Sequence, residues 1–83
     1  MNEILGTEFG DVLTMLRKKS GLSQQQLAMR CGIHRTFVSM LERGMRLPSL
    51  QSFFILAHGL DIEPNELLTL VLQFNRLDSQ DLT

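Results

Sequence analysis

The sequence predicts an all-α fold, one compact domain built from five helices. Sustained period-2 alternation and Asn-Gly or Asp-Gly hairpin turns are missing, whereas apolar residues recur at helical spacing along the chain. At 83 residues the chain lies at the low end of the usual domain size, so we expect a single core. The helices are expected over about 7–20, 24–31, 34–43 and 50–58, and from residue 64 onward.

The ends of the first three helices carry clear signals. Gly21, Gly32 and Gly44 stand where a left-handed residue would end each helix. Ser23 and Gln26 have the spacing of a capping box, in which each side chain bonds the other residue's backbone amide. Two short helices joined by a glycine-containing turn match the layout of a helix-turn-helix.

The last two helices are the more apolar. Ser49 is a good N-cap for the fourth helix, Gly59 is expected to close it, and Pro64 suits the first position of the fifth. In the fourth helix we expect burial of Leu50, Phe53, Phe54, Leu56 and Ala57. The fifth carries more apolar surface than a small monomer can bury on one side, which predicts a homodimer. The predicted dimerisation residues are Leu67, Leu70, Val71 and Phe74.

We divide the chain into three parts. Residues 1–6 form an N-terminal extension, 7–75 form the domain with its dimerisation helix, and 76–83, which are polar and aperiodic, form a flexible tail. No apolar run approaches the roughly 20 residues that cross a bilayer, and the N-terminus lacks the features of a secretory signal. Cys31 is the only cysteine, which fits a reducing compartment. We therefore expect a cytoplasmic protein without a membrane partner.

Charge is segregated along the chain, although the net charge is only −1. Residues 12–59 carry seven bases and one acid, a net charge of +6, whereas residues 1–11 carry −3 and residues 60–83 carry −4. Lys and Arg bind DNA by neutralising phosphates. A basic middle with acidic ends therefore suits a molecule that turns one face toward DNA.

A set of positions between residues 13 and 68 has a distinctive spacing. They are Leu13, Leu16, Arg17, Gly21, Leu22, Ser23, Gln24, Leu27, Ala28, Gly32, Ser39, Leu41, Glu42, Arg43, Gly44, Pro48, Ser49, Leu50, Leu56, Ala57, Leu67 and Leu68. This pattern resembles the Cro/C1 (XRE-like) helix-turn-helix regulators over about residues 7–70, and the run 34–39 is most similar to the controller proteins of restriction-modification systems. The resemblance implies a lambda-repressor-like DNA-binding domain.

The same resemblance implies that the third helix reads bases, and the side chains suggest how. Arg35 is the best candidate, because its guanidinium fork matches O6 and N7 of guanine; a phosphate or solvent-facing arginine is the alternative. Thr36 offers a hydroxyl and a methyl group. Met40 and Phe37 can make only apolar contacts, for instance with a thymine methyl, and Phe37 could instead pack against the domain.

Other residues are implied to contact phosphates, which fixes the register on DNA without reading sequence. They are Ser23, Gln24, His34, Ser39, Arg43 and Arg46. A structural N-cap is the alternative for His34, and an exposed loop arginine for Arg46. The family pattern also pairs Arg17 with Glu42 in a largely buried ion pair.

Together these features describe a sequence-specific transcriptional regulator that binds a palindromic operator in double-stranded DNA as a homodimer. At a promoter it would exclude RNA polymerase or recruit it. The alternative is an antitoxin or other protein-interaction module on the same fold, which the basic third helix disfavours. We expect no enzyme, metal site or cofactor, because His34 and His58 form no catalytic or ligand spacing with the carboxylates.

Overall fold

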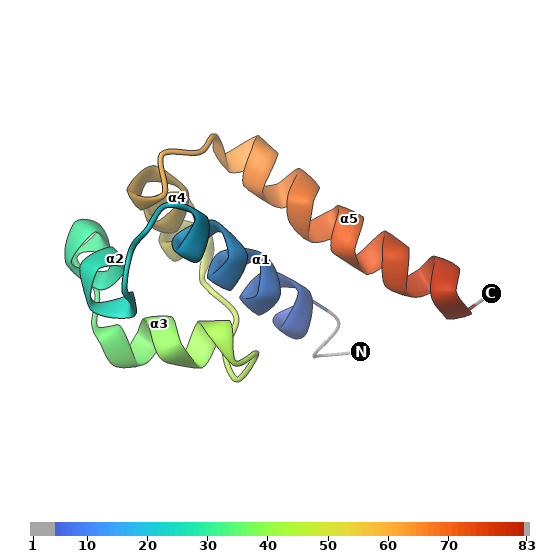
Figure 1. Cartoon of the computed structure of the whole chain (residues 1–83), viewed down its shortest axis with the longest axis horizontal. Coiled ribbons are helices and arrows are strands. Elements are labelled where there is room, and N and C mark those ends of the chain that lie inside the picture. Colours follow the sequence, from blue (N-terminus) through green and yellow to red (C-terminus); the bar gives the residue numbers. More distant parts are fainter. Residues whose placement is uncertain (1–4, 83) are drawn as a thin grey trace.

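The computed structural model describes the backbone of residues 5–82 and the side chains of residues 5–74. The described chain contains five helices and no strand, so the predicted all-α fold is confirmed (Figure 1). The helices are α1 (Gly6–Lys19), α2 (Gln24–Cys31), α3 (Arg35–Glu42), α4 (Leu50–Gly59) and α5 (Pro64–Leu82). Up to the start of α5, their ends lie close to the predicted ones.

The predicted signals operate at both ends of α2. Gly21 precedes the helix with φ of 73° and Gly32 follows it with φ of 68°, in the left-handed region that glycine enters without strain. The capping box is complete: the Gln26 amide donates to Ser23 Oγ at 3.0 Å, and the Ser23 amide donates to Gln26 Oε1 at 2.8 Å. These signals fix where α2 starts and where the chain turns toward α3.

Helix α4 ends at Gly59, the residue predicted to close it, but the backbone of this glycine is not left-handed. The left-handed residue that follows is Asp61, with φ of 57°. Aspartate is among the few residues that tolerate this region. A Cβ on Gly59 would lie 2.5 Å from Cys31 Sγ, so glycine is needed there for α2 to pack closely on α4.

All five helices contribute to one core. Helix α1 lies between α3 and α5 and packs on both, while α2 packs on α3 and α4 (Figure 1). The largest fully buried side chains are Val12, Leu13, Leu27, Val38, Leu41, Leu56 and Leu67. Because α3 is held by both α1 and α2, its outer face is presented on a rigid support.

Burial on α4 is only partly as predicted. Leu56 and Ala57 are fully buried and Phe53 is half-buried. In contrast, Leu50 and Phe54 were expected to be buried, but they are 72% and 50% exposed. They line an apolar hollow between α4 and α5, together with Pro64 and Leu68.

Helix α5 also departs from the prediction. Leu67 and Val71, expected at a dimer contact, lie in the core of the monomer with 0% and 3% exposure, so they are not surface residues. Leu70 and Phe74 are half-buried against the same core. Among the described side chains of α5, the exposed large apolar ones are instead Leu68 and Leu72. The candidate dimer contact on α5 therefore includes Leu68 and Leu72 instead of Leu67 and Val71.

The two chain ends bear on the predicted domain limits. Leu5 packs against the core, and residues 1–4 lie outside the described part. The backbone of α5 continues to Leu82, beyond residue 76, where we expected a flexible tail; the side chains of that segment are outside the described residues. The division into extension, domain and tail stays a prediction. No described helix is long and apolar enough to cross a membrane.

Gly10 marks the close crossing of α1 and α3. A Cβ there would lie 2.6 Å from the carbonyl oxygens of both Leu41 and Glu42, which are backbone atoms. A glycine-to-alanine change inside a helix normally stabilises by about 0.5–1 kcal/mol. We predict the opposite sign for Gly10→Ala, a loss of about 1–3 kcal/mol in the free energy of unfolding, because the two helices must separate.

Urea unfolding followed by circular dichroism measures this change. Lys18→Ala, at an exposed position of the same helix, is the control and should change stability by no more than about 0.5 kcal/mol. A Gly10→Ala protein as stable as the wild type would contradict the close crossing.

Candidate nucleic-acid interface

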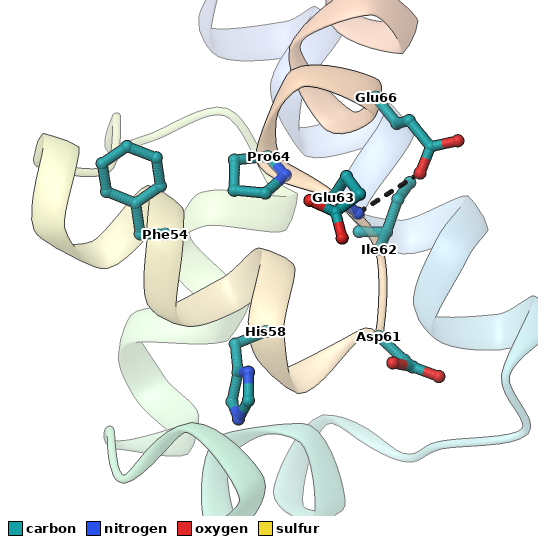
Figure 2. Close-up of a pocket in the computed structure, with 7 residues that line it drawn as sticks. All are labelled: Phe54, His58, Asp61, Ile62, Glu63, Pro64 and Glu66. Atoms are coloured by element: carbon teal, nitrogen blue, oxygen red, sulfur yellow. Dashed lines mark hydrogen bonds between the residues drawn. The ribbon is translucent and has the colours of Figure 1, made fainter.

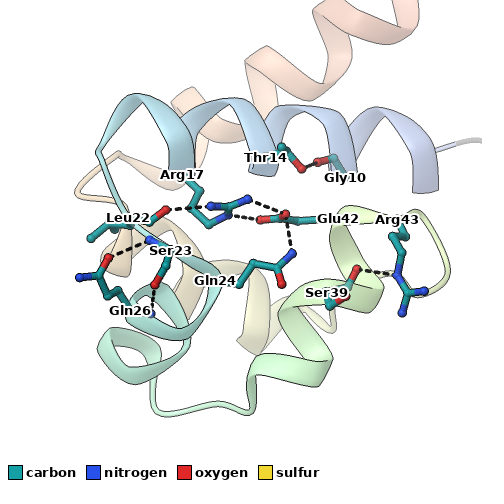
Figure 3. Close-up of polar contacts among 10 residues, drawn as sticks. All are labelled: Gly10, Thr14, Arg17, Leu22, Ser23, Gln24, Gln26, Ser39, Glu42 and Arg43. Atoms are coloured by element: carbon teal, nitrogen blue, oxygen red, sulfur yellow. Dashed lines mark hydrogen bonds and ion pairs between the residues drawn. The ribbon is translucent and has the colours of Figure 1, made fainter.

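The polar centre of the domain is an ion pair between α1 and the end of α3 (Figure 3). Arg17 donates from Nε to Glu42 Oε2 at 2.5 Å and from Nη2 to Oε1 at 3.0 Å, a bidentate arrangement. Its Nη1 donates to the Leu22 carbonyl at 2.8 Å. The two side chains are only 11% and 6% exposed, so the pair is largely withdrawn from water, as the sequence predicted.

Gln24 joins this ion pair from the first turn of α2. Its Nε2 donates to Glu42 Oε1 at 3.0 Å, so Glu42 connects α1, α2 and α3 (Figure 3). The amide has a second hydrogen, and the first backbone N–H groups of α2 have no partner within the helix. The predicted phosphate contact at Gln24 is thus compatible with its bond to Glu42, and α2 would direct its positive end toward the phosphate.

The charge of Glu42 depends on these partners. Burial alone would raise the pKa of its carboxyl group. The hydrogen bonds from Arg17 and Gln24 and the positive charge of Arg17 outweigh burial, and the pKa is lowered from its ordinary value of 4.5. The same bond to Glu42 raises the pKa of Arg17 despite its burial. Both groups are therefore charged at neutral pH.

The outer face of α3 brings together most of the predicted contact residues. Arg35 and Thr36 are exposed in its first turn, Ser39 and Met40 are half-buried in the middle, and Arg43 is exposed directly after it. Arg43 Nε donates to the Ser39 carbonyl at 3.4 Å, which keeps the guanidinium close to the helix (Figure 3). Since Val38 and Leu41 are buried, this stripe of residues faces away from the core.

The other predicted contact residues lie around α3, and their side chains differ in exposure and in bonding. His34 occupies the N-cap position of α3 with extended backbone angles, but its exposed side chain makes no capping bond. The Ser23 hydroxyl accepts the capping bond of α2, and its own hydrogen remains available to a phosphate. Arg46 lies in the loop after α3, and its guanidinium carbon is 5.4 Å from the centre of the Phe37 ring. Phe37 also packs against the core, which supports the packing alternative for it.

Sequence reasoning missed three features of this region. Gly10 allows the close crossing, but its spacing signals nothing unless the neighbouring helix is known. The bond from Gln24 to Glu42 and the contact of Arg46 with Phe37 join residues on separate elements. Periodicity within one helix does not reveal such contacts.

A hollow with a volume of about 510 Å³ lies beside the turn between α4 and α5 (Figure 2). Its charged and polar lining includes His58, Asp61, Glu63 and Glu66. Glu66 Oε1 accepts a hydrogen bond from the Glu63 backbone amide at 3.3 Å, which caps the start of α5. The side chains of His58 and Asp61 point away from this bond. Within residues 5–74, no three His, Cys, Asp or Glu side chains cluster as metal ligands.

The ion pair predicts how stability depends on pH. Because the folded pKa of Glu42 is lowered, its stabilising effect is complete above about pH 4.5 and is lost as the pH falls through the folded value. Glu42→Gln leaves Arg17 without a counter-charge, so at neutral pH we expect a loss of about 3–5 kcal/mol in the free energy of unfolding. The difference between wild type and variant should shrink as the pH falls below 4.5.

Urea unfolding at a series of pH values tests this. Asp11→Asn, at an exposed carboxylate of α1, serves as the control and should stay close to wild type at neutral pH. A Glu42→Gln or Glu42→Ala protein that is stably folded at neutral pH yet fails to bind DNA would show that Glu42 has a binding role rather than a structural one.

Comparison with known proteins also identifies a helix-turn-helix in this chain. The family model described as helix-turn-helix matches residues 13–67. Control protein C.BamHI of Bacillus amyloliquefaciens is 39% identical over 61 residues, which are 72% of this chain and 75% of that protein. Control protein C.MunI of a Mycoplasma species is 39% identical over 70 residues, 83% of this chain and 93% of that protein.

A solved structure extends the agreement to three dimensions. The restriction-modification controller protein C.AhdI from Aeromonas hydrophila superposes with a TM-score of 0.71 and 48% sequence identity, covering 74% of this chain and 92% of that one. The named relatives are regulators or control proteins. The chain therefore belongs to the helix-turn-helix family, as a DNA-binding transcriptional regulator of the Cro/C1 (XRE-like) type that is similar to restriction-modification controller proteins.

Proposed function

We propose that this protein binds a palindromic operator as a homodimer, with α3 of each protomer in the major groove. The observation that carries the proposal is the stripe of polar and basic side chains on α3, held rigidly by the buried Arg17–Glu42 pair behind it. A helix can enter the major groove and contact base edges there. Position and chemistry thus both favour α3 as the reading element.

The side chains of this surface divide into two roles. Arg35 and Thr36, exposed at the N-terminal end of α3, would read bases, since that end of a recognition helix meets the base edges. Arg43 and Ser39 at the other end, with Gln24 at the start of α2, would bind phosphates. Met40, half-buried in the middle of the stripe, would make an apolar contact.

A continuous apolar surface on α4 and α5 supports the homodimer. Two neighbouring apolar hollows share Phe53 and Leu68, which makes the surface continuous across the two helices. The large apolar side chains exposed along it are Leu47, Leu50, Phe54 and Leu68, and α5 also exposes Leu72, one turn after Leu68. An apolar patch of this kind marks an interaction site. A two-fold dimer through it would set two copies of α3 about 34 Å apart, one turn of DNA.

We further propose that the dimer controls transcription of restriction-modification genes, as the name restriction-modification controller protein suggests for C.AhdI. Depending on where the operator lies, the bound dimer would block RNA polymerase or contact it. It would act in the cytoplasm, where bacterial DNA is accessible. The exposed apolar surface also fits the second candidate, an antitoxin or other protein-interaction module, which the experiments below separate from a regulator.

Selection of binding sequences from a random DNA pool tests the reading role. The wild type should enrich a symmetric motif. Arg35→Ala should relax one position in each half-site, because a bidentate pair discriminates by about 1–3 kcal/mol. Arg43→Ala should instead weaken binding to all sequences and reduce the slope of log K against log salt by about 0.9 for each lost contact. No enrichment by the wild type would favour the protein-interaction module.

Sedimentation equilibrium tests the dimer. We expect the wild type to be dimeric at micromolar concentration and Leu68→Glu to be monomeric, because the change places a charge in the apolar surface. Met29→Glu is the matched control: Met29 is 71% exposed on α2, away from this surface, and the variant should remain dimeric. A monomeric wild type at this concentration would refute the homodimer, provided that circular dichroism shows a folded chain.

A further inference from the structure

The loop after α3 is anchored before it reaches Arg46. The Met45 amide donates to the Met40 carbonyl at 2.9 Å, which joins the loop to α3. Gly44, with φ of 74°, lies so close to α1 that a Cβ on it would be 3.4 Å from Thr7 Cα. These contacts fix the backbone just before Arg46, so that its side chain starts from a defined position.

The side chain of Arg46 then returns toward α3. Its guanidinium carbon lies 5.4 Å from the centre of the Phe37 ring, within the range of a cation–π contact. Among residues 5–74, the structure gives Arg46 neither a hydrogen-bond acceptor nor a carboxylate partner, so its N–H donors remain for a ligand. The Phe37 ring is itself held, because it is half-buried and packs against the core.

We propose that Phe37 is a positioning residue whose ring holds Arg46 beside the outer face of α3, ready to bind a DNA phosphate. The inference rests on the proposed function, since it takes α3 as the DNA-binding face. An arginine that is already held loses less side-chain freedom on binding than a free one. Phe37 thus acts through Arg46 rather than by an apolar contact of its own with a base.

A double-mutant cycle on DNA affinity tests this. The probe is a duplex of mixed sequence, because phosphate contacts do not depend on the bases. Phe37→Leu should weaken binding by about two- to fivefold per protomer, the fold-change of a cation–π contact at an exposed site. Phe37→Trp, which keeps an aromatic face, should retain the affinity. In an Arg46→Ala background, Phe37→Leu should change nothing further.

Arg43→Ala provides the matched background, since Arg43 is also exposed and basic but bonds to Ser39 rather than to the ring. There Phe37→Leu should keep its full effect. An equal effect of Phe37→Leu in the Arg46→Ala background would overturn the proposal, because Phe37 would then act on DNA without Arg46. Thermal unfolding of each variant separates a binding effect from a folding defect.

Proton NMR of the free protein tests the contact without DNA. The Arg46 Cδ protons should be shifted upfield by the ring current in the wild type and in Arg43→Ala, and the shift should vanish in Phe37→Leu. An unshifted Arg46 in the folded wild type would overturn the positioning role. If the shift is present but the wild type binds no duplex at all, the proposed function fails instead, and the role of Arg46 on phosphate fails with it.

Discussion

The arrangement of the helix-turn-helix depends on one carboxylate. Glu42 ends α3, accepts two bonds from Arg17 on α1, and accepts a third from Gln24 at the start of α2. It is the only acid between residues 12 and 59, where seven bases would otherwise repel one another. A buried ion pair stabilises little by itself, since desolvation opposes the attraction, but removing one partner leaves a buried charge. The pair therefore specifies how the three helices meet.

Gly10, where α1 crosses α3, also determines how closely these two helices meet. Its missing side chain lets α1 approach the carbonyl groups of Leu41 and Glu42, so Arg17, two turns later on α1, reaches the carboxylate. Helix α3 has only eight residues, and an isolated helix of that length is marginal in water. Its order comes from these contacts, and the side chains on its outer face inherit that order. Rigid presentation of this kind is what precise recognition requires.

The parts of the fold that sequence predicts are those with local causes. Capping residues and left-handed glycines act within four or five residues, and so the limits of α2 follow from Ser23, Gln26 and Gly32. Burial on α4 and α5 depends instead on contacts between separate helices. An apolar stripe shows that a helix face needs cover, but not which neighbour covers it. Leu67 and Val71 are covered by the monomer itself, whereas Leu50 is not.

The ion pair could be predicted from the family pattern, but the contacts between other residues of the site could not. The family pattern that the sequence resembles pairs Arg17 with Glu42, and the structure shows that pair. The contact of Arg46 with Phe37 crosses from a loop to a helix, and no spacing within the sequence indicates it. The predicted role of Gly59 was incomplete for the same reason: its close approach to Cys31 depends on how α2 crosses α4, and Asp61, two residues later, takes the left-handed position.

The charge segregation of the sequence has a counterpart in space that bears on how DNA is approached. Arg35, Arg43 and Arg46, three of the exposed bases among residues 5–74, lie on α3 and the loop after it, whereas the exposed acids of the α4–α5 turn line the hollow of Figure 2. Helix α1 lies between α3 and α5. Phosphates attract the first surface and repel the second, so the field of the protein orients it before contact. In the proposed dimer the apolar surface of α4 and α5 would then be free of DNA, so that one protomer would use both surfaces at once.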